Sequence, residues 1–180
     1  QKADATHAGL VKTLVSGASV TGLTFVNPRI EVVGAKAEEN YAGVLAGTAS
    51  GATITDVSVE RFADGDAAYI SSIRWMTAAS TNVGGIVGKA EAATTITNAS
   101  VNGIDIVGAS LAGSDTKSLR TVMAGGIAGV SEANITESSV SNSRILIERN
   151  DRYRNYYLSY AGGIAGYSNK GTITNCYYYD

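Results

Sequence analysis

The stretch "ERNDRYRNYYLSY", from Glu148 to Tyr160, holds the side chains best suited to recognising a ligand. Arginines alternate there with tyrosines, so rigid hydrogen-bond donors lie beside flat rings on which a sugar, a carboxylate or a protein surface can pack. With the one tryptophan, the candidate ligand-binding residues are Trp75, Arg149, Arg152, Tyr153, Arg154, Tyr156 and Tyr157. The alternative is structural: the rings cover the edge of the fold, and the arginines pair with Glu148 and Asp151.

Metal and catalytic chemistry have weaker candidates. In "RFADGDAAY", Asp64 and Asp66 flank a glycine, as in some calcium-binding loops, but the further ligands of an EF-hand are missing and a plain turn explains the same residues. No carboxylate pair recurs at a spacing that would fix acid–base chemistry. We therefore predict no catalytic, cofactor-binding or firm metal-binding residues. His7 is expected to be solvated, and Cys176 to be a small core residue.

Composition narrows the function classes further. The chain has 180 residues, a net charge of −2 and a single cysteine. This charge draws in neither nucleic acid nor an anionic membrane surface, and no apolar run approaches the roughly 20 residues of a membrane span. One cysteine rules out an internal disulfide framework. The length fits one domain, covering residues 1–180.

A recurring glycine-rich motif must position the candidate side chains. Its copies read "YAGVLAGTASGATITDVSV", "VGGIVGKAEAATTITNASV", "AGGIAGVSEANITESSV" and "AGGIAGYSNKGTITNCYYY", with a degenerate first copy, "AGLVKTLVSGASVTGLTF". The first glycines of the copies are Gly9, Gly43, Gly84, Gly125 and Gly162, at spacings of 34, 41, 41 and 37 residues. Repeats of this length indicate a solenoid, in which each unit buries its apolar face against its neighbours.

The apolar positions indicate which kind of solenoid. They alternate with a period of two and are rich in isoleucine and valine, which predicts strands rather than helices. The columns expected to stack are Val11, Leu45, Ile86, Ile127 and Ile164; Val20, Ile54, Ile96, Ile135 and Ile173; Leu23, Val57, Ala99, Ser138 and Cys176; and Phe25, Val59, Val101, Val140 and Tyr178. Three short strands per repeat describe an all-β fold, a parallel β-helix of about five coils that begin near residues 8, 42, 83, 124 and 161. We expect it to be right-handed.

Insertions account for the unequal repeat lengths. They span Gly34–Tyr41, Glu60–Asn82, Val107–Met123 and Glu148–Tyr160, and they hold more than half of the charged and aromatic residues. Because each leaves its coil at the same corner, we expect the insertions to stack along one edge of the β-helix. In solenoids, such an edge often forms the binding face.

The repeated motif resembles the GLUG repeat, with "AGGIAGYSNKGTITNCYYY" and its sibling copies carrying the resemblance from Ala8 to Tyr179. That repeat occurs in β-helical regions of bacterial surface and secreted proteins, including the amino-terminal parts of immunoglobulin-A1 metalloproteases. The resemblance implies an exported bacterial β-helix. It does not carry over the protease chemistry, because that needs an H-E-x-x-H zinc helix and this sequence has a single histidine, His7.

These observations favour a non-catalytic extracellular or cell-surface module that binds a host protein or glycan, or that spaces another domain. Two alternatives remain open: a polysaccharide lyase or hydrolase with its cleft on the insertion edge, and a structural assembly unit. No nucleic-acid partner and no membrane insertion are expected. An uncapped β-helix presents an open edge, so we expect end-to-end self-association, further domains of the same polypeptide, or a plug formed by Tyr177–Asp180.

Overall fold

The structure of the protein is a computed structural model. It describes residues 2–3, 6–34, 38–62, 67–74, 79–111, 120–149 and 157–180. Within these ranges the chain is built from β-strands. The strands form five sheets, named A to E here, of five strands each. Sheet A contains β1 (Lys2–Ala3), β6 (Arg29–Gly34), β11 (Tyr69–Arg74), β16 (Asp105–Ser110) and β21 (Arg144–Arg149). Sheet B contains β2 (His7–Ala8), β7 (Asn40–Ala42), β12 (Thr81–Gly84), β17 (Arg120–Gly125) and β22 (Tyr157–Gly162).

The other three sheets are made of shorter strands. Sheet C contains β3 (Val11–Leu14), β8 (Ala46–Ala49), β13 (Val87–Ala90), β18 (Ala128–Ser131) and β23 (Ala165–Ser168). Sheet D contains β4 (Ser19–Thr21), β9 (Thr53–Thr55), β14 (Thr95–Thr97), β19 (Asn134–Thr136) and β24 (Ile173–Thr174). Sheet E contains β5 (Thr24–Val26), β10 (Ser58–Glu60), β15 (Ser100–Asn102), β20 (Ser139–Ser141) and β25 (Tyr177–Tyr179).

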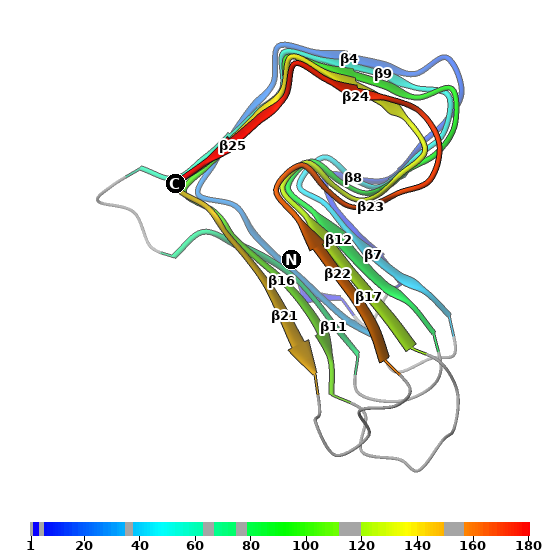
Figure 1. The fold of residues 1–180 in the computed structure, drawn as a ribbon, viewed down its shortest axis with the longest axis vertical. Helices are drawn as coiled ribbons and strands as arrows, with labels where there is room; N and C mark the ends of the chain where they lie inside the picture. The colour runs from blue at the N-terminus through cyan, green and yellow to red at the C-terminus, as the bar shows by residue number, and fades with distance from the viewer. Residues whose placement is uncertain are drawn as a thin grey trace.

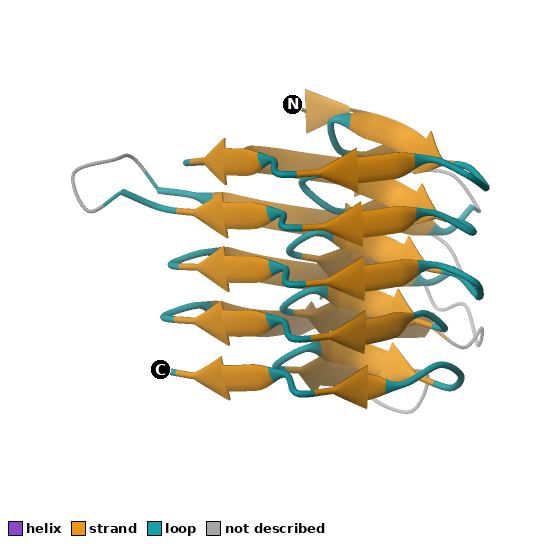
Figure 2. Ribbon diagram, turned by 90° about the horizontal axis from the view of Figure 1, so that it is seen from above, coloured by secondary structure: helices purple, strands orange, loops and turns teal. Residues whose placement is uncertain are grey.

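The chain winds through the sheets in a fixed order. It passes through sheets C, D, E, A and B and then returns to sheet C one strand further along, so neighbouring strands of a sheet are five elements apart in the chain. The pairings are parallel in every sheet, and Figure 2 shows the resulting stack of strands. The predicted all-β parallel solenoid is confirmed.

Apolar columns fill the narrow interior. Seen along the stack, sheets A and B form one half of the cross-section and sheets C and D the other, with sheet E joining D to A (Figure 1). The predicted columns are in register: Ile54 pairs with Ile96 and Ile96 with Ile135, and all three are fully buried. The column that includes Val59 and Val101 is confirmed in the same way. Burial of such β-branched side chains, each worth about 1.5–3 kcal/mol, holds neighbouring strands together.

The prediction of three strands per repeat is wrong, because each turn of the chain contributes a strand to all five sheets. The segment around Ile54 is split by a corner, where Asp56 has φ 54° and its equivalents Asn98 and Glu137 have φ 51° and 53°. A residue in this left-handed region turns the chain sharply out of the extended path of a strand. The step of three residues between Ile54 and Val57, which interrupts the period of two, is this corner between sheets D and E.

Two further predictions are corrected by the strand register. Val11 pairs with Ala46 rather than with Leu45, because the first copy reaches sheet C with one residue fewer than the others. The proposed insertion Glu60–Asn82 contains the strand β11, in which Ile70 pairs with Ile30 and Ile106. The last residues of the sheet A strands, and likewise the first residues of the sheet B strands, nevertheless lie at one edge of the stack, as the order of the strands requires.

Candidate functional site

Most of the predicted ligand-binding residues lie outside the described part of the chain. These are Trp75, Arg152, Tyr153, Arg154 and Tyr156, and the same holds for the calcium candidates Asp64 and Asp66. Arg149 is the last residue of β21 in sheet A and Tyr157 the first of β22 in sheet B. The arginine- and tyrosine-rich segment therefore connects these two sheets, and its proposed binding role stays a prediction.

The described residues form a different candidate site, where the outer faces of sheets B and C meet. The two sheets join at a tight corner and diverge from it (Figure 1). A column on sheet B consists of His7, Tyr41, Asn82, Met123 and Tyr160, which pair in register. A column on sheet C consists of Thr13, Thr48, Lys89, Val130 and Tyr167, also in register. We call the space between these columns the B–C groove.

A pocket of about 160 Å³ lies in the middle of the B–C groove. Its walls contain Asn82 and Met123 from sheet B, Lys89, Val130 and Tyr167 from sheet C, and the flanking residues Glu39 and Glu132. Acceptors, a cation, a ring and apolar groups therefore surround one small volume. Such a mixture of a few polar groups with apolar walls is typical of ligand pockets.

Glycines set the angle between the two walls. A Cβ atom on Gly84, at the end of β12, would lie 2.1 Å from the carbonyl oxygen of Val87 at the start of β13. A Cβ atom on Gly88 would lie 2.7 Å from the backbone nitrogen of Ala42 in sheet B. Because backbone atoms cannot give way as flexible side chains do, only glycine lets sheets B and C approach this closely.

Asn82 is the most constrained polar group of the pocket. The residue is only 1% exposed, and its Nδ2 donates a hydrogen bond of 3.2 Å to the carbonyl oxygen of Asn40. Its Oδ1 is buried and has no hydrogen-bond partner within the described part of the chain. A buried acceptor without a donor costs free energy, and this one belongs to a residue that lines the pocket.

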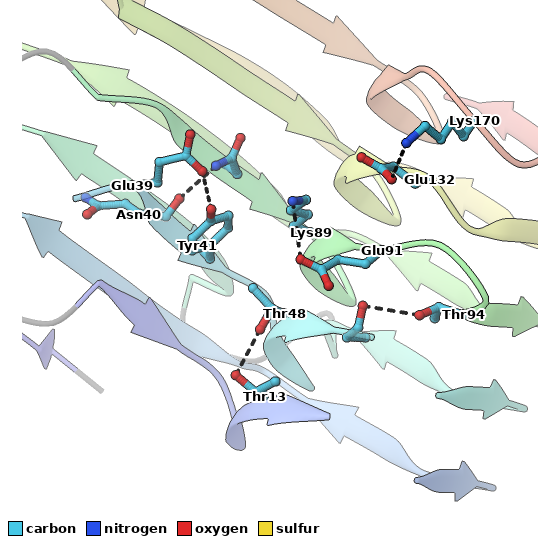
Figure 3. A network of polar contacts seen from close by, with 12 residues as sticks. Thr13, Glu39, Asn40, Tyr41, Thr48, Lys89, Glu91, Thr94, Glu132 and Lys170 are labelled. Atoms are coloured by element: carbon cyan, nitrogen blue, oxygen red, sulfur yellow. Dashed lines mark hydrogen bonds and ion pairs between the residues drawn. The ribbon is translucent and has the colours of Figure 1, made fainter. Parts of the chain in front are cut away.

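Two lysines on the rim of the B–C groove are paired with glutamates, whereas Glu39 is bonded to the hydroxyl group of Tyr41 (Figure 3). Lys89 Nζ lies 3.3 Å from Glu91 Oε1, and Lys170 Nζ lies 3.4 Å from Glu132 Oε2. Each ion pair is partly exposed and contributes little to stability. Their effect is on the charge of the groove, which is nearly neutral despite its many ionised groups.

Aromatic rings flank the pocket on both sides along the stack. Tyr41 donates a hydrogen bond from its hydroxyl group to Glu39, and its ring centroid lies 4.8 Å from that of His7. Burial, followed by the hydrogen bond to Glu39, raises the pKa of Tyr41, while burial lowers the pKa of His7. Tyr160 and Tyr167 pack together on the other side, with centroids 5.4 Å apart. At neutral pH the pair of His7 and Tyr41 is therefore uncharged, and Tyr41 keeps its hydroxyl proton.

A second polar hollow lies at the corner between sheets E and A. It has a volume of about 480 Å³ and is lined by Arg61, Asn102, Gly103, Asp105, Asn142 and Arg144. Arg144 donates from Nε and Nη2 to the two carboxylate oxygens of Asp105, both at 2.8 Å. The hydrogen bonds from Arg144 lower the pKa of Asp105. Arg144 and Asp105 are the side chains of the hollow best suited to bind a ligand, and they are already bonded to each other. The hollow is therefore a weaker candidate binding site than the B–C groove.

Replacing Arg144 by glutamine should return the carboxyl pKa of Asp105 towards its ordinary value. In the wild type that pKa is lower in the folded than in the unfolded chain, so the ion pair stabilises the fold above the unfolded pKa. This stabilisation disappears as the pH falls through the folded pKa. Because the pair is exposed, Arg144→Gln should destabilise the fold only slightly at pH 7, and not at all once the pH lies below the folded pKa. Carboxyl NMR titration and urea unfolding measure both effects.

The matched control for this prediction is Lys170→Gln, which removes another exposed cation that is paired with Glu132 rather than Asp105. The Asp105 titration should be unchanged in this control. An unchanged Asp105 titration in Arg144→Gln itself would show that the bidentate contact does not form in solution.

The sequence signals the groove residues only indirectly. Tyr41, Asn82 and Met123 each lie two residues before the marker glycine of a repeat, and Lys89 and Tyr167 each lie five residues after it. At these positions the residue type varies from copy to copy, while the positions around them stay small or apolar. Such variable positions within a regular repeat are where individual side chains can serve recognition rather than packing.

Two kinds of feature, a metal-ligand cluster and a membrane-spanning helix, are absent from the described ranges. No cluster of three or more histidine, cysteine, aspartate or glutamate side chains could hold a metal ion there. Within the same ranges, no helix is long and apolar enough to cross a membrane.

Comparison with known proteins supports the repeat assignment for one part of the chain. No curated protein and no solved structure matches the chain. Residues 79–107, which contain the complete strands β12 to β15 and thus Asn82 and Lys89 of the B–C groove, match the model of the GLUG motif. The resemblance to the GLUG repeat is confirmed by this match.

Proposed function

We propose that this protein is a non-catalytic β-helical module that binds an extracellular ligand. The observation that carries the proposal is the B–C groove, in which two in-register columns enclose a pocket with an unpaired buried acceptor, Asn82 Oδ1. Regular repeats supply the rigid walls, and the variable positions supply the recognition groups. Spacing another domain from a surface is compatible with the same rigid stack.

The carboxylates of the groove support binding rather than catalysis. Glu39 accepts a hydrogen bond from Tyr41, Glu91 pairs with Lys89, and Glu132 pairs with Lys170. Glycoside hydrolysis requires two carboxyl groups that face each other across the substrate, one of them protonated. Each of these three groups is instead held by a tyrosine or a lysine, so we propose that the groove holds its ligand without cleaving it.

The proposed location is the bacterial cell surface or the extracellular medium. The GLUG match at residues 79–107 supports it, because this repeat is a feature of surface and secreted bacterial β-helices. The arginine- and tyrosine-rich segment between β21 and β22 is proposed as a second contact surface for a host protein or glycan. It leads directly into sheet B, which forms one wall of the groove.

A binding screen tests this function. The immobilised chain should bind at least one member of a panel of extracellular matrix proteins and polysaccharides in a saturable manner, and a heat-unfolded sample should not. The ligand recovered from the complex should have an unchanged mass. Depolymerisation of any polysaccharide in the panel would contradict the non-catalytic proposal, and failure of the whole panel to bind would contradict the binding module.

A further inference from the structure

We infer that the B–C groove binds a sugar ring of an uncharged glycan chain, in the pocket between Asn82 and Tyr167. This inference rests on the proposed function and gives it a site and a ligand class. Three properties of the pocket lead to it: the hydrogen-bonding character of its polar groups, its near-neutral charge, and its shape.

The hydrogen-bonding groups call for a ligand that both donates and accepts. Asn82 Oδ1 is a buried acceptor without a partner among the described residues, and Glu132 lines the same pocket with further acceptor oxygens. Lys89, with its side chain 26% exposed, is a donor on the facing wall. A hydroxyl group is both donor and acceptor, so a ring that carries several hydroxyls can satisfy both walls at once.

Charge argues against an ionic ligand. The two lysines on the rim are each paired with a glutamate at 3.3–3.4 Å. An anionic ligand would have to displace these carboxylates. A cationic one would have to displace a lysine, or compete with the hydroxyl group of Tyr41 for Glu39. An uncharged ligand needs neither exchange and can use the outward atoms of the paired groups as they stand.

The shape of the pocket fits one ring. Its volume of about 160 Å³ is well below the roughly 300–1,000 Å³ of pockets for drug-sized molecules. Tyr167, 39% exposed, presents a ring on which the apolar face of a sugar can pack, and Met123 and Val130 complete an apolar surface. The groove continues along the stack to Tyr41 and Tyr160, which offer further rings to a longer chain.

An extended peptide fits less well. Peptides that bind to sheets usually add a strand to a free edge and gain main-chain hydrogen bonds. The central strands of the groove, β12 and β17 in sheet B and β13 and β18 in sheet C, are already paired on both sides. Recognition in the groove must therefore come from side chains, which favours a ligand rich in hydroxyl groups.

The test uses the full chain and linear hexasaccharides of glucose, mannose, galactose and N-acetylglucosamine, with calorimetry as the readout. At least one should bind, and Tyr167→Ala and Asn82→Ala should each weaken that binding by about tenfold or more. Tyr179→Ala is the matched control, because Tyr179 lies in the same outermost turn of the chain, is 57% exposed, and is on sheet E, away from the groove. It should change the affinity less than about twofold. Circular dichroism verifies that each variant is folded.

Other outcomes separate this inference from the proposed function. Hexasaccharide binding that both groove variants leave unchanged would overturn the site while supporting a binding module. Binding of a peptide library instead, with loss of affinity in Tyr167→Ala, would overturn the ligand class. If the hexasaccharides fail but a matrix protein binds elsewhere on the chain, this inference falls and the proposed function stands.

Discussion

Replacing Ile127 by aspartate should abolish cooperative folding of the whole chain. Ile127 is fully buried at the corner between sheets B and C, where its backbone bonds to Ile86 on one side and Ile164 on the other. An unpaired carboxylate there costs several kcal/mol, in addition to roughly 2–5 kcal/mol for the lost apolar side chain. These costs together match or exceed the stability of about 5–15 kcal/mol that a typical domain has. Thermal melting followed by circular dichroism measures the loss.

Two control substitutions make this result specific. Ile127→Val keeps the position apolar and should cost only about 1 kcal/mol. Ile173→Asp adds the same charge in the outermost turn of the chain, where the side chain is 42% exposed, and should leave a cooperative transition. A variant Ile127→Asp that melts like the wild type would contradict the register of the buried column.

Replacing Gly125 by valine should be the second most damaging change. A Cβ atom at this position would lie 2.0 Å from the carbonyl oxygen of Ala128 and 2.5 Å from the backbone nitrogen of Gly166. Both are backbone atoms of sheet C, so relief requires the two sheets to separate. We expect a loss of about 3 kcal/mol or more in the free energy of unfolding, at the upper end of overpacking effects, together with a widened B–C groove.

The control for this prediction is Gly17→Asn. Gly17 has φ +81°, and nothing lies within 4 Å of a Cβ atom built on it, while asparagine tolerates the left-handed region better than most residues. Urea unfolding should show a change of less than about 1 kcal/mol for this variant. Equal destabilisation by Gly17→Asn and Gly125→Val would mean that close approach of sheets B and C does not explain the corner glycines.

The fold class and most of the core are predictable from the sequence alone. Repetition of the glycine motif requires stacking, and the period of two requires strands, so alignment of the copies identifies the column of Ile54, Ile96 and Ile135 that the strand register confirms. Cys176 packs partly buried against this core, as predicted from its place in the repeat. Both predictions succeed for the same reason, that equivalent residues in a solenoid have equivalent neighbours. Residues that align between successive copies are therefore expected to contact each other.

The number of strands per turn is not predictable in the same way. The corner between sheets D and E is made by Asp56, Asn98 and Glu137 at positive φ. Aspartate and asparagine occur there more often than most residues, but a glutamate rarely does. Only the first copy has at this corner the glycine that usually marks such a turn, Gly22 with φ 68°. In the other copies no glycine separates the two strands, so they read as one.

The B–C groove escapes prediction for a different reason. Alternation along a strand tells which side chains point outward, but not that the outward faces of two successive sheets converge. This convergence depends on the contact between Gly84 and the carbonyl oxygen of Val87. The glycines stand out in the sequence as the markers of the repeat, and only their spatial effect, a sharp angle with polar side chains on both walls, requires the structure.

The most direct test of the central claim, that the B–C groove is the binding surface, is a backbone and side-chain amide NMR titration. The ligand is whichever panel member binds in the screen. If the groove is the binding surface, the largest shift changes should follow its two columns and include the side-chain amide of Asn82. Shift changes that leave Asn82, Lys89 and Tyr167 untouched, and that concentrate on the segment between β21 and β22 or on the E–A corner, would contradict it.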